Sequence, residues 1–253
     1  MGMPSSALSR NEPTAGAATR SPLATARLAG LLYLLIAAAA AVAHAYVPAQ
    51  LIVAGDAAAT AANVVANESL VRWGLVADIL MAAVFVFLGL ALQRLLYESN
   101  ARLATAILVL VSAAAASILV NLAFHAGALI VATQAPFAGR NDELVLLMFE
   151  LHRNGYELGG ILFGLWLLPV GLIALRSPLF HRGVGVVLIT GAIAWLLSTV
   201  LKSVPLEGLE LVTTILTIPM LIAEFGLILY LLIVGVRSSR ETMPADRDAL
   251  SLL

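Results

Sequence analysis

The sequence contains no cysteine, and only 11% of its 253 residues are charged. The absence of cysteine excludes disulfide bonds, thiolate nucleophiles and thiolate-bound metal, so any metal would need histidine or carboxylate ligands. A soluble domain carries about 25% charged residues, whereas this chain is 61% hydrophobic. Most of its surface is therefore expected to face lipid. With a net charge of -1, the chain has no basic surface that would favour nucleic acid.

Common catalytic and cofactor motifs are also missing. The sequence has no P-loop, no G-x-G-x-x-G fingerprint, no H-E-x-x-H zinc motif and no G-x-S-x-G nucleophile elbow. It shows no haem or flavin signature, so the sequence alone predicts no cofactor and no metal. It also lacks a 3+3 internal repeat of the kind found in many secondary transporters. Function therefore has to be argued from individual ionisable residues.

What the chain does have is six apolar runs. A transmembrane helix needs about 20 apolar residues. The runs cover residues 28–47, 73–92, 103–131, 155–175, 183–201 and 211–236. They predict an all-α, polytopic bundle of six spans over residues 27–237, flanked by disordered cytoplasmic tails at 1–26 and 238–253. An alternative is signal-peptide cleavage after residues 43–45, "AHA", which would leave five spans.

The placement of lysine and arginine predicts the orientation. With the N-terminus in the cytoplasm, ten arginines lie inside and four basic residues lie outside, namely Arg72, Arg140, Arg153 and Lys202. We therefore expect a bacterial cytoplasmic membrane protein with both termini inside. The two larger outer loops predict short interfacial helices. One follows Asp56, a candidate helix N-cap, and the other covers residues 141–153 before a bend at Gly155. The spacings Gly155/Gly159 and Gly160/Gly164 are typical of close helix packing.

Several patches resemble a known family. They include "RLAGLLYLL", "GDAAATAANVVANESLVRWGLVADIL", "YELGGILFGLWLLPVGLIALRS" and "IAEFGLILYLLIVGVR". Together they resemble the DUF4386 family of uncharacterised bacterial integral membrane proteins over residues 25 to 237. The family has no assigned function, so the resemblance implies a fold and draws attention to Asp56, Asp78 and Glu224, without implying any chemistry.

Three carboxylates lie inside or close to the predicted spans. A charge at the bilayer centre costs about 2.5–3.5 kcal/mol on insertion scales, so such a group usually faces other helices and has a partner. At about 1.5 Å per residue, Asp78 lies about 9 Å and Glu157 about 6 Å from the outer edge, whereas Glu224 lies near the midplane. The simplest interpretation is structural: Asp78 would pair with Arg72, Lys202 or an asparagine and lock helices together.

Other polar residues gather in the outer half of the predicted bundle. Asn121 and His125 are four residues apart and share one helix face. The inner half is nearly free of polar side chains, which predicts a polar cavity open to the outer side, with Glu224 at its floor. In purely structural terms, Glu224 would bond to Thr217 or to a neighbouring helix, and His44 would be an interface anchor.

Three functions fit these residues. The first is binding or transport of a small solute or lipid head group, with Asp78 and Glu224 as ligand or proton sites. The second is a structural or regulatory membrane subunit whose buried charges fix helix register. The third is an intramembrane metal-dependent hydrolase, with Asp78, His125, Glu224 and His152 as ligands and Glu157 as general base. Membrane lipids are the one partner common to all three.

Overall fold

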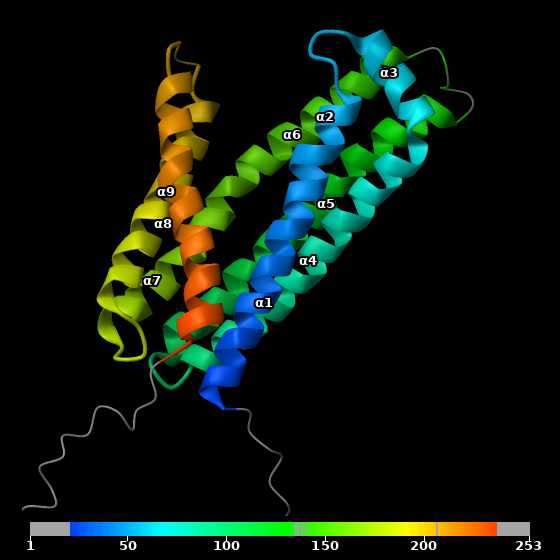
Figure 1. Ribbon diagram of the computed structural model, residues 1–253. Helices are drawn as coiled ribbons and strands as arrows, with labels where there is room; N and C mark the ends of the chain where they lie inside the picture. The colour runs from blue at the N-terminus through cyan, green and yellow to red at the C-terminus, as the bar shows by residue number, and fades with distance from the viewer. Residues whose placement is uncertain (1–20, 135–136, 138, 140, 206, 237–253) are drawn as a thin grey trace, which may run out of the picture.

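The structure is a computed structural model that describes residues 21–134, 137, 139, 141–205 and 207–236. In this part of the chain it is all-helical (Figure 1). Six helical segments are long and apolar enough to cross a membrane: Pro22–Leu51, Glu68–Leu96, Ala101–Thr133, Asp142–Arg176, Arg182–Ser203 and Glu210–Val234. The prediction of six spans is confirmed.

The first span is built from α1 (Pro22–Ala40), the π-helical turn η1 (Ala41–Tyr46) and α2 (Val47–Leu51), which follow one another without a break. The Ser21 side chain accepts a hydrogen bond from the Ala24 amide, and Pro22 occupies the first turn, where its missing N–H costs nothing. Residues 22–26, expected in the disordered tail, are therefore helical. The rest of both predicted tails, apart from Ser21, lies outside the described residues.

The short helix predicted after Asp56 is present as α3 (Ala57–Ala66). The Asp56 carboxylate accepts a hydrogen bond from the Ala59 amide at 2.9 Å, so Asp56 caps the helix as expected. The buried Thr60 hydroxyl donates a hydrogen bond to the Asp56 carbonyl at 2.8 Å and accepts one from the Val53 amide at 3.1 Å. These bonds hold α3 against the chain that enters it, and α4 (Glu68–Leu96) follows.

The prediction of a second, separate interfacial helix over residues 141–153 is wrong. After α5 (Ala101–Thr133), α6 (Asp142–Leu165) runs through Gly155 without the expected bend. The interruption comes later, between α6 and α7 (Leu167–Arg176). Pro169 explains that position, because it has no N–H to bond to the carbonyl of Leu165 one turn earlier.

The last spans are α8 (Arg182–Ser203) and α9 (Glu210–Leu229), which ends in the π-helical turn η2 (Tyr230–Val234). Figure 1 shows that α8 and α9 diverge from α1, α4 and α5 toward the end that carries α3. We call α1–α6 the first arm, α7–α9 with η2 the second arm, and the end that carries α3 the α3 end. Both described chain ends lie at the opposite end.

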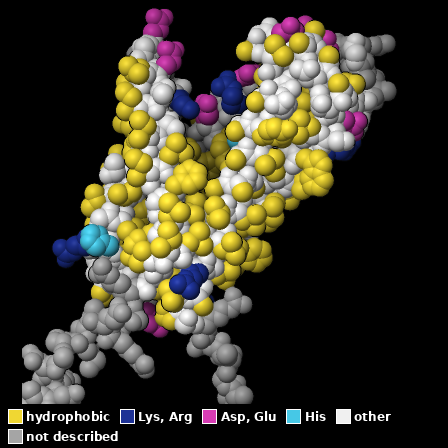
Figure 2. All heavy atoms as spheres, viewed as in Figure 1, with side chains coloured by type: hydrophobic (Ala, Val, Ile, Leu, Met, Phe, Trp, Pro, Cys, Tyr) yellow, Lys and Arg dark blue, Asp and Glu magenta, His cyan; other side chains and the backbone are white. Residues whose placement is uncertain are grey.

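The two arms meet through small residues. A Cβ atom on Gly164 would lie 2.9 Å from the Ala192 carbonyl, and one on Gly160 would lie 2.4 Å from the Thr199 hydroxyl. Only glycine therefore lets α6 approach α8 this closely. Figure 2 shows hydrophobic side chains over the middle of both arms, with charged ones at the two ends and around the mouth of the hollow between the arms. This distribution fits a multipass membrane protein.

Candidate metal centre

Three histidines from three different helical segments surround Asp78, which lies on α4 and is fully buried. His44 Nε2, from η1, is 2.9 Å from Asp78 Oδ1. His125 Nδ1, from α5, and His152 Nε2, from α6, are each 3.8 Å from Asp78 Oδ2. The carboxylate that sequence analysis found inside the second span is thus the centre of a histidine cluster.

The polar atoms of this cluster lack aligned hydrogen bonds among the described residues. Both oxygens of Asp78 are buried without one, as are His44 Nε2, His152 Nε2 and both ring nitrogens of His125. The 2.9 Å contact between His44 and Asp78 has the length of an ion pair, but it is not aligned as a hydrogen bond. Buried polar atoms left unsatisfied cost about 1–3 kcal/mol each. Their convergence on one point is what an ion-binding site requires.

The geometry suits a transition metal. One ligand atom from each of Asp78, His125 and His152 lies within 4.8 Å of the others. Zinc bonds of about 2.0–2.1 Å in a tetrahedral site place neighbouring ligand atoms about 3.4 Å apart. The two 3.8 Å contacts would therefore have to shorten by about 0.4 Å. Imidazole and carboxylate are also the donors left to a chain without cysteine.

Asn121 holds His152 on the side of the ring that faces away from Asp78. The Asn121 amide donates to the His152 backbone carbonyl at 2.7 Å, and His152 Nδ1 lies 3.3 Å from the Asn121 backbone carbonyl. A proton on Nδ1 would bond to that carbonyl and leave the lone pair of Nε2 directed toward Asp78. Histidine ligands of metals are commonly held in this way.

Two glycines make room for the cluster. A Cβ atom on Gly155 would lie 2.1 Å from Asn121 Oδ1, and one on Gly74 would lie 3.0 Å from His125 Cε1. Real Cβ contacts shorter than 3.0 Å essentially never occur. Gly155 is therefore required for the contact between α5 and α6 that holds Asn121 beside His152.

Of the predicted site residues, Asp78, Asn121 and His125 come together, whereas Arg72 stays apart. The Arg72 guanidinium pairs with Glu68 on the surface of α4. The predicted pairing of Asp78 with Arg72, Lys202 or an asparagine is wrong, because histidines from neighbouring helices occupy the space around Asp78.

Glu157 and Lys202 form a separate pair on the surface. Lys202 Nζ is 3.5 Å and Arg153 Nη1 is 3.6 Å from the Glu157 carboxylate. Glu157 therefore pairs with Arg153 on its own helix and with Lys202 on α8. All three side chains are at least one-third exposed, so this network contributes little to stability.

Glu224 belongs to a different site, so it does not join the metal ligands that sequence analysis grouped with it. Its Oε1 accepts a hydrogen bond from Trp195 Nε1 at 2.9 Å. Thr217 instead donates to the Thr213 carbonyl at 3.2 Å, so of the two predicted partners of Glu224 the neighbouring helix is the one present. An α-helical hydroxyl four residues from a backbone carbonyl can satisfy itself within its own helix.

Sequence reasoning underestimated His44, which it interpreted as an interface anchor. Three of the four histidines lie toward the α3 ends of their spans, at depths similar to that of Asp78. This shared depth is the sequence signal from which the role of His44 could have been predicted. The π-helical turn that carries it is a feature often found at functional sites.

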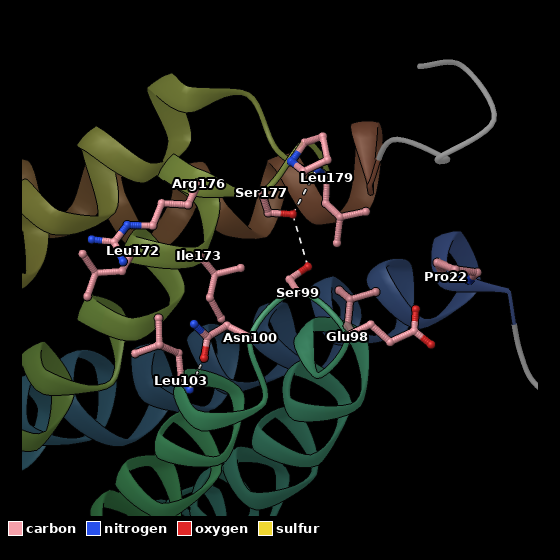
Figure 3. Close-up of a pocket in the computed structure, with 12 residues that line it drawn as sticks. Pro22, Glu98, Ser99, Asn100, Leu103, Leu172, Ile173, Arg176, Ser177 and Leu179 are labelled. Carbon is pink, nitrogen blue, oxygen red and sulfur yellow. Dashed lines mark hydrogen bonds between the residues drawn. The ribbon is translucent and has the colours of Figure 1, made fainter. Parts of the chain in front are cut away.

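A cavity of about 540 Å³ lies at the end of the molecule opposite the α3 end, between the α4–α5 and α7–α8 connections. Figure 3 shows the Ser99 and Ser177 hydroxyls facing each other there, 3.2 Å apart, whereas Glu98 and Arg176 point away from each other. The labelled charged groups do not converge on one point. We assign no chemistry to this cavity.

Six apolar helical segments and a buried polar cluster define a multipass helical membrane protein. Its family is shown by a family model, Domain of unknown function (DUF4386), that matches residues 28–235, and the chain belongs to this family. Neither the curated proteins nor the solved structures include a significant match.

Proposed function

We propose that the chain is a metal-dependent hydrolase of the membrane, with zinc held by Asp78, His125 and His152. The observation that carries this proposal is the convergence of their buried, unpartnered ligand atoms within 4.8 Å. Structural charges that merely lock helices together would be expected to satisfy one another with aligned hydrogen bonds, and these do not.

The number of ligands favours a catalytic zinc site over a structural one. Catalytic zinc sites typically have three protein ligands and a fourth position for water, which the metal activates for attack on a carbonyl or phosphoryl group. His44 faces the second oxygen of Asp78, and 22% of its side chain is exposed. We assign it to orienting Asp78.

The substrate is proposed to be a small solute or a lipid head group that approaches from the outer side. The α3 end is the outer end in the orientation favoured by the arginine distribution, with both termini in the cytoplasm of a bacterium. The hollow between the arms opens toward this end (Figure 2). Reporter fusions test the orientation: a cytoplasmic reporter at the C-terminus should be active, and a periplasmic one inactive.

Metal analysis of the detergent-purified protein is the direct test. We expect about one zinc per chain in the wild type and in Glu224→Gln, and none in Asp78→Ala or His152→Ala. Glu224→Gln is the matched control, because it removes an equally unusual membrane carboxylate outside the cluster. Metal-free wild-type protein that takes up no added zinc would refute the site.

Hydrolysis needs a separate readout. With 4-nitrophenyl acetate and bis(4-nitrophenyl) phosphate as probes, the zinc-loaded protein should release nitrophenolate, and chelator or His152→Ala should stop the release. Bound zinc without hydrolysis of either probe would overturn the catalytic role. The metal would then have the structural or regulatory role that is the alternative for this chain.

A further inference from the structure

A second cavity, of about 80 Å³, lies where the two arms meet. Four segments of the first arm line it, together with the α6–α7 junction and one residue from each of α8 and α9. The lining residues are Tyr33, Ile36, Ala37, Ala40, Met81, Phe85, Ile118, Tyr156, Phe163, Trp166, Trp195 and Glu224. Neither Asp78 nor any of the three clustered histidines is among them.

Glu224 gives this cavity its acidic group. It is the one acidic side chain in the lining, and no lysine, arginine or histidine lines the cavity with it. Trp195 donates to one of its oxygens at 2.9 Å, and none of the ion pairs among the described residues involves Glu224. A carboxylate within a membrane span normally has a charged partner. A ligand with a positive charge would be that partner for Glu224.

Aromatic rings make up half of the twelve lining residues. Tyr33 and Trp166 meet edge to face, with centroids 5.5 Å apart, and Phe163 and Trp195 do so at 5.7 Å. Aromatic faces attract ammonium groups, with a gain of about 2 kcal/mol or more when the pair is shielded from water. Rings surrounding a single carboxylate form the type of site that binds organic cations.

The Tyr33 hydroxyl is an independent indication of a ligand. The Tyr33 side chain lines the cavity and is only 3% exposed, and its hydroxyl has no hydrogen-bond partner among the described residues. Leaving such a group unsatisfied costs about 1–3 kcal/mol. A ligand N–H or hydroxyl group would satisfy it.

We propose that this cavity binds the ammonium group of a small organic cation, with Glu224 as counter-ion, the aromatic rings as walls and the Tyr33 hydroxyl as a polar contact. The cavity has room for one substituted ammonium group. This inference does not depend on the metal centre. The site would nevertheless be its neighbour, because the Tyr156 ring, which lines the cavity, lies 3.9 Å from the ring of His44.

Choline and its neutral carbon isostere, 3,3-dimethyl-1-butanol, provide a matched pair of probes. Binding to the full chain in detergent can be followed by titration calorimetry and by the fluorescence of the lining tryptophans. We expect choline to bind, and the neutral isostere to bind at least about tenfold more weakly. Equal binding of the two probes, or no binding of choline, would overturn the proposal.

Variants locate the binding site. Glu224→Gln should weaken choline binding about tenfold or more, whereas Glu157→Gln, which neutralises an exposed carboxylate, should leave it unchanged. If Glu224→Gln does not fold, Tyr33→Phe decides, because it removes only the hydroxyl and should weaken choline binding several-fold. Choline binding that survives Tyr33→Phe and any folded Glu224→Gln would refute the assignment. The zinc content of each variant separates failure here from failure of the metal centre.

Discussion

Replacing Gly155 by alanine tests whether the contact between α5 and α6 builds the metal centre. The new Cβ atom would lie 2.1 Å from Asn121 Oδ1. Tolerable contacts begin near 3.4 Å, so the two atoms would have to separate by about 1.3 Å, the difference between these distances. Either the helices move apart or Asn121 rotates away from the carbonyl of His152.

Both outcomes carry a cost that can be estimated. Overpacking of a tight contact costs about 1–3 kcal/mol, which exceeds the gain of up to about 1 kcal/mol from replacing glycine by alanine in a helix. A shift of about 1 Å also exceeds the tolerance of about 0.2 Å in metal–ligand distances. Gly155→Ala should therefore lower stability by about 1–2 kcal/mol and zinc affinity by about 10–100-fold.

Gly159, one turn further along α6, is the matched control. A Cβ atom there would come no closer than 3.7 Å to any neighbour, so Gly159→Ala should leave zinc affinity unchanged and stability equal or slightly higher. Thermal unfolding in detergent and competition with a zinc-binding dye measure the two quantities. If Gly155→Ala behaves like Gly159→Ala in both assays, the contact does not position the ligands and the reasoning fails.

Three further substitutions probe separate contacts. Asn121→Ala should lower zinc affinity about 10–100-fold in a folded protein, measured by dye competition, because it removes the bond that fixes the backbone of His152; unchanged affinity would contradict its positioning role. Asp56→Ala should cost about 0.5–2 kcal/mol and speed hydrogen exchange within α3, whose first turn it caps; unaltered exchange would count against that cap. Lys202→Ala should change the free energy of unfolding by less than about 1 kcal/mol, because its side chain is 43% exposed; a larger loss in chemical denaturation would mean that the surface network matters.

The sequence predicted what depends on local composition. Apolar length located the six spans, and the cap at Asp56 marked the start of α3. The helical repeat placed Asn121 and His125 on one face. Each of these features is determined within a single segment, so no knowledge of the neighbouring helices was needed.

Partners across helices could not be read in the same way. Which helix lies beside Asp78 depends on the order in which the spans pack, and the helical repeat defines a face without naming its neighbour. Arg72 seemed a suitable partner by charge, yet Glu68 on its own helix is closer and holds it. At Gly155 the expected bend is absent, whereas the close packing that its spacing to Gly159 indicates is present, against Asn121 of α5, a neighbour that the spacing does not name.

The division of the molecule into two arms places Glu224 and the histidine cluster on different parts of the chain. Every side chain of the histidine cluster comes from the first arm, whereas Trp195 and Glu224 come from α8 and α9 of the second. Substitutions in the last two helices can therefore alter the surroundings of Glu224 without changing any side chain of the histidine cluster. The first arm, by contrast, supplies side chains to both sites, so substitutions there can affect the two together.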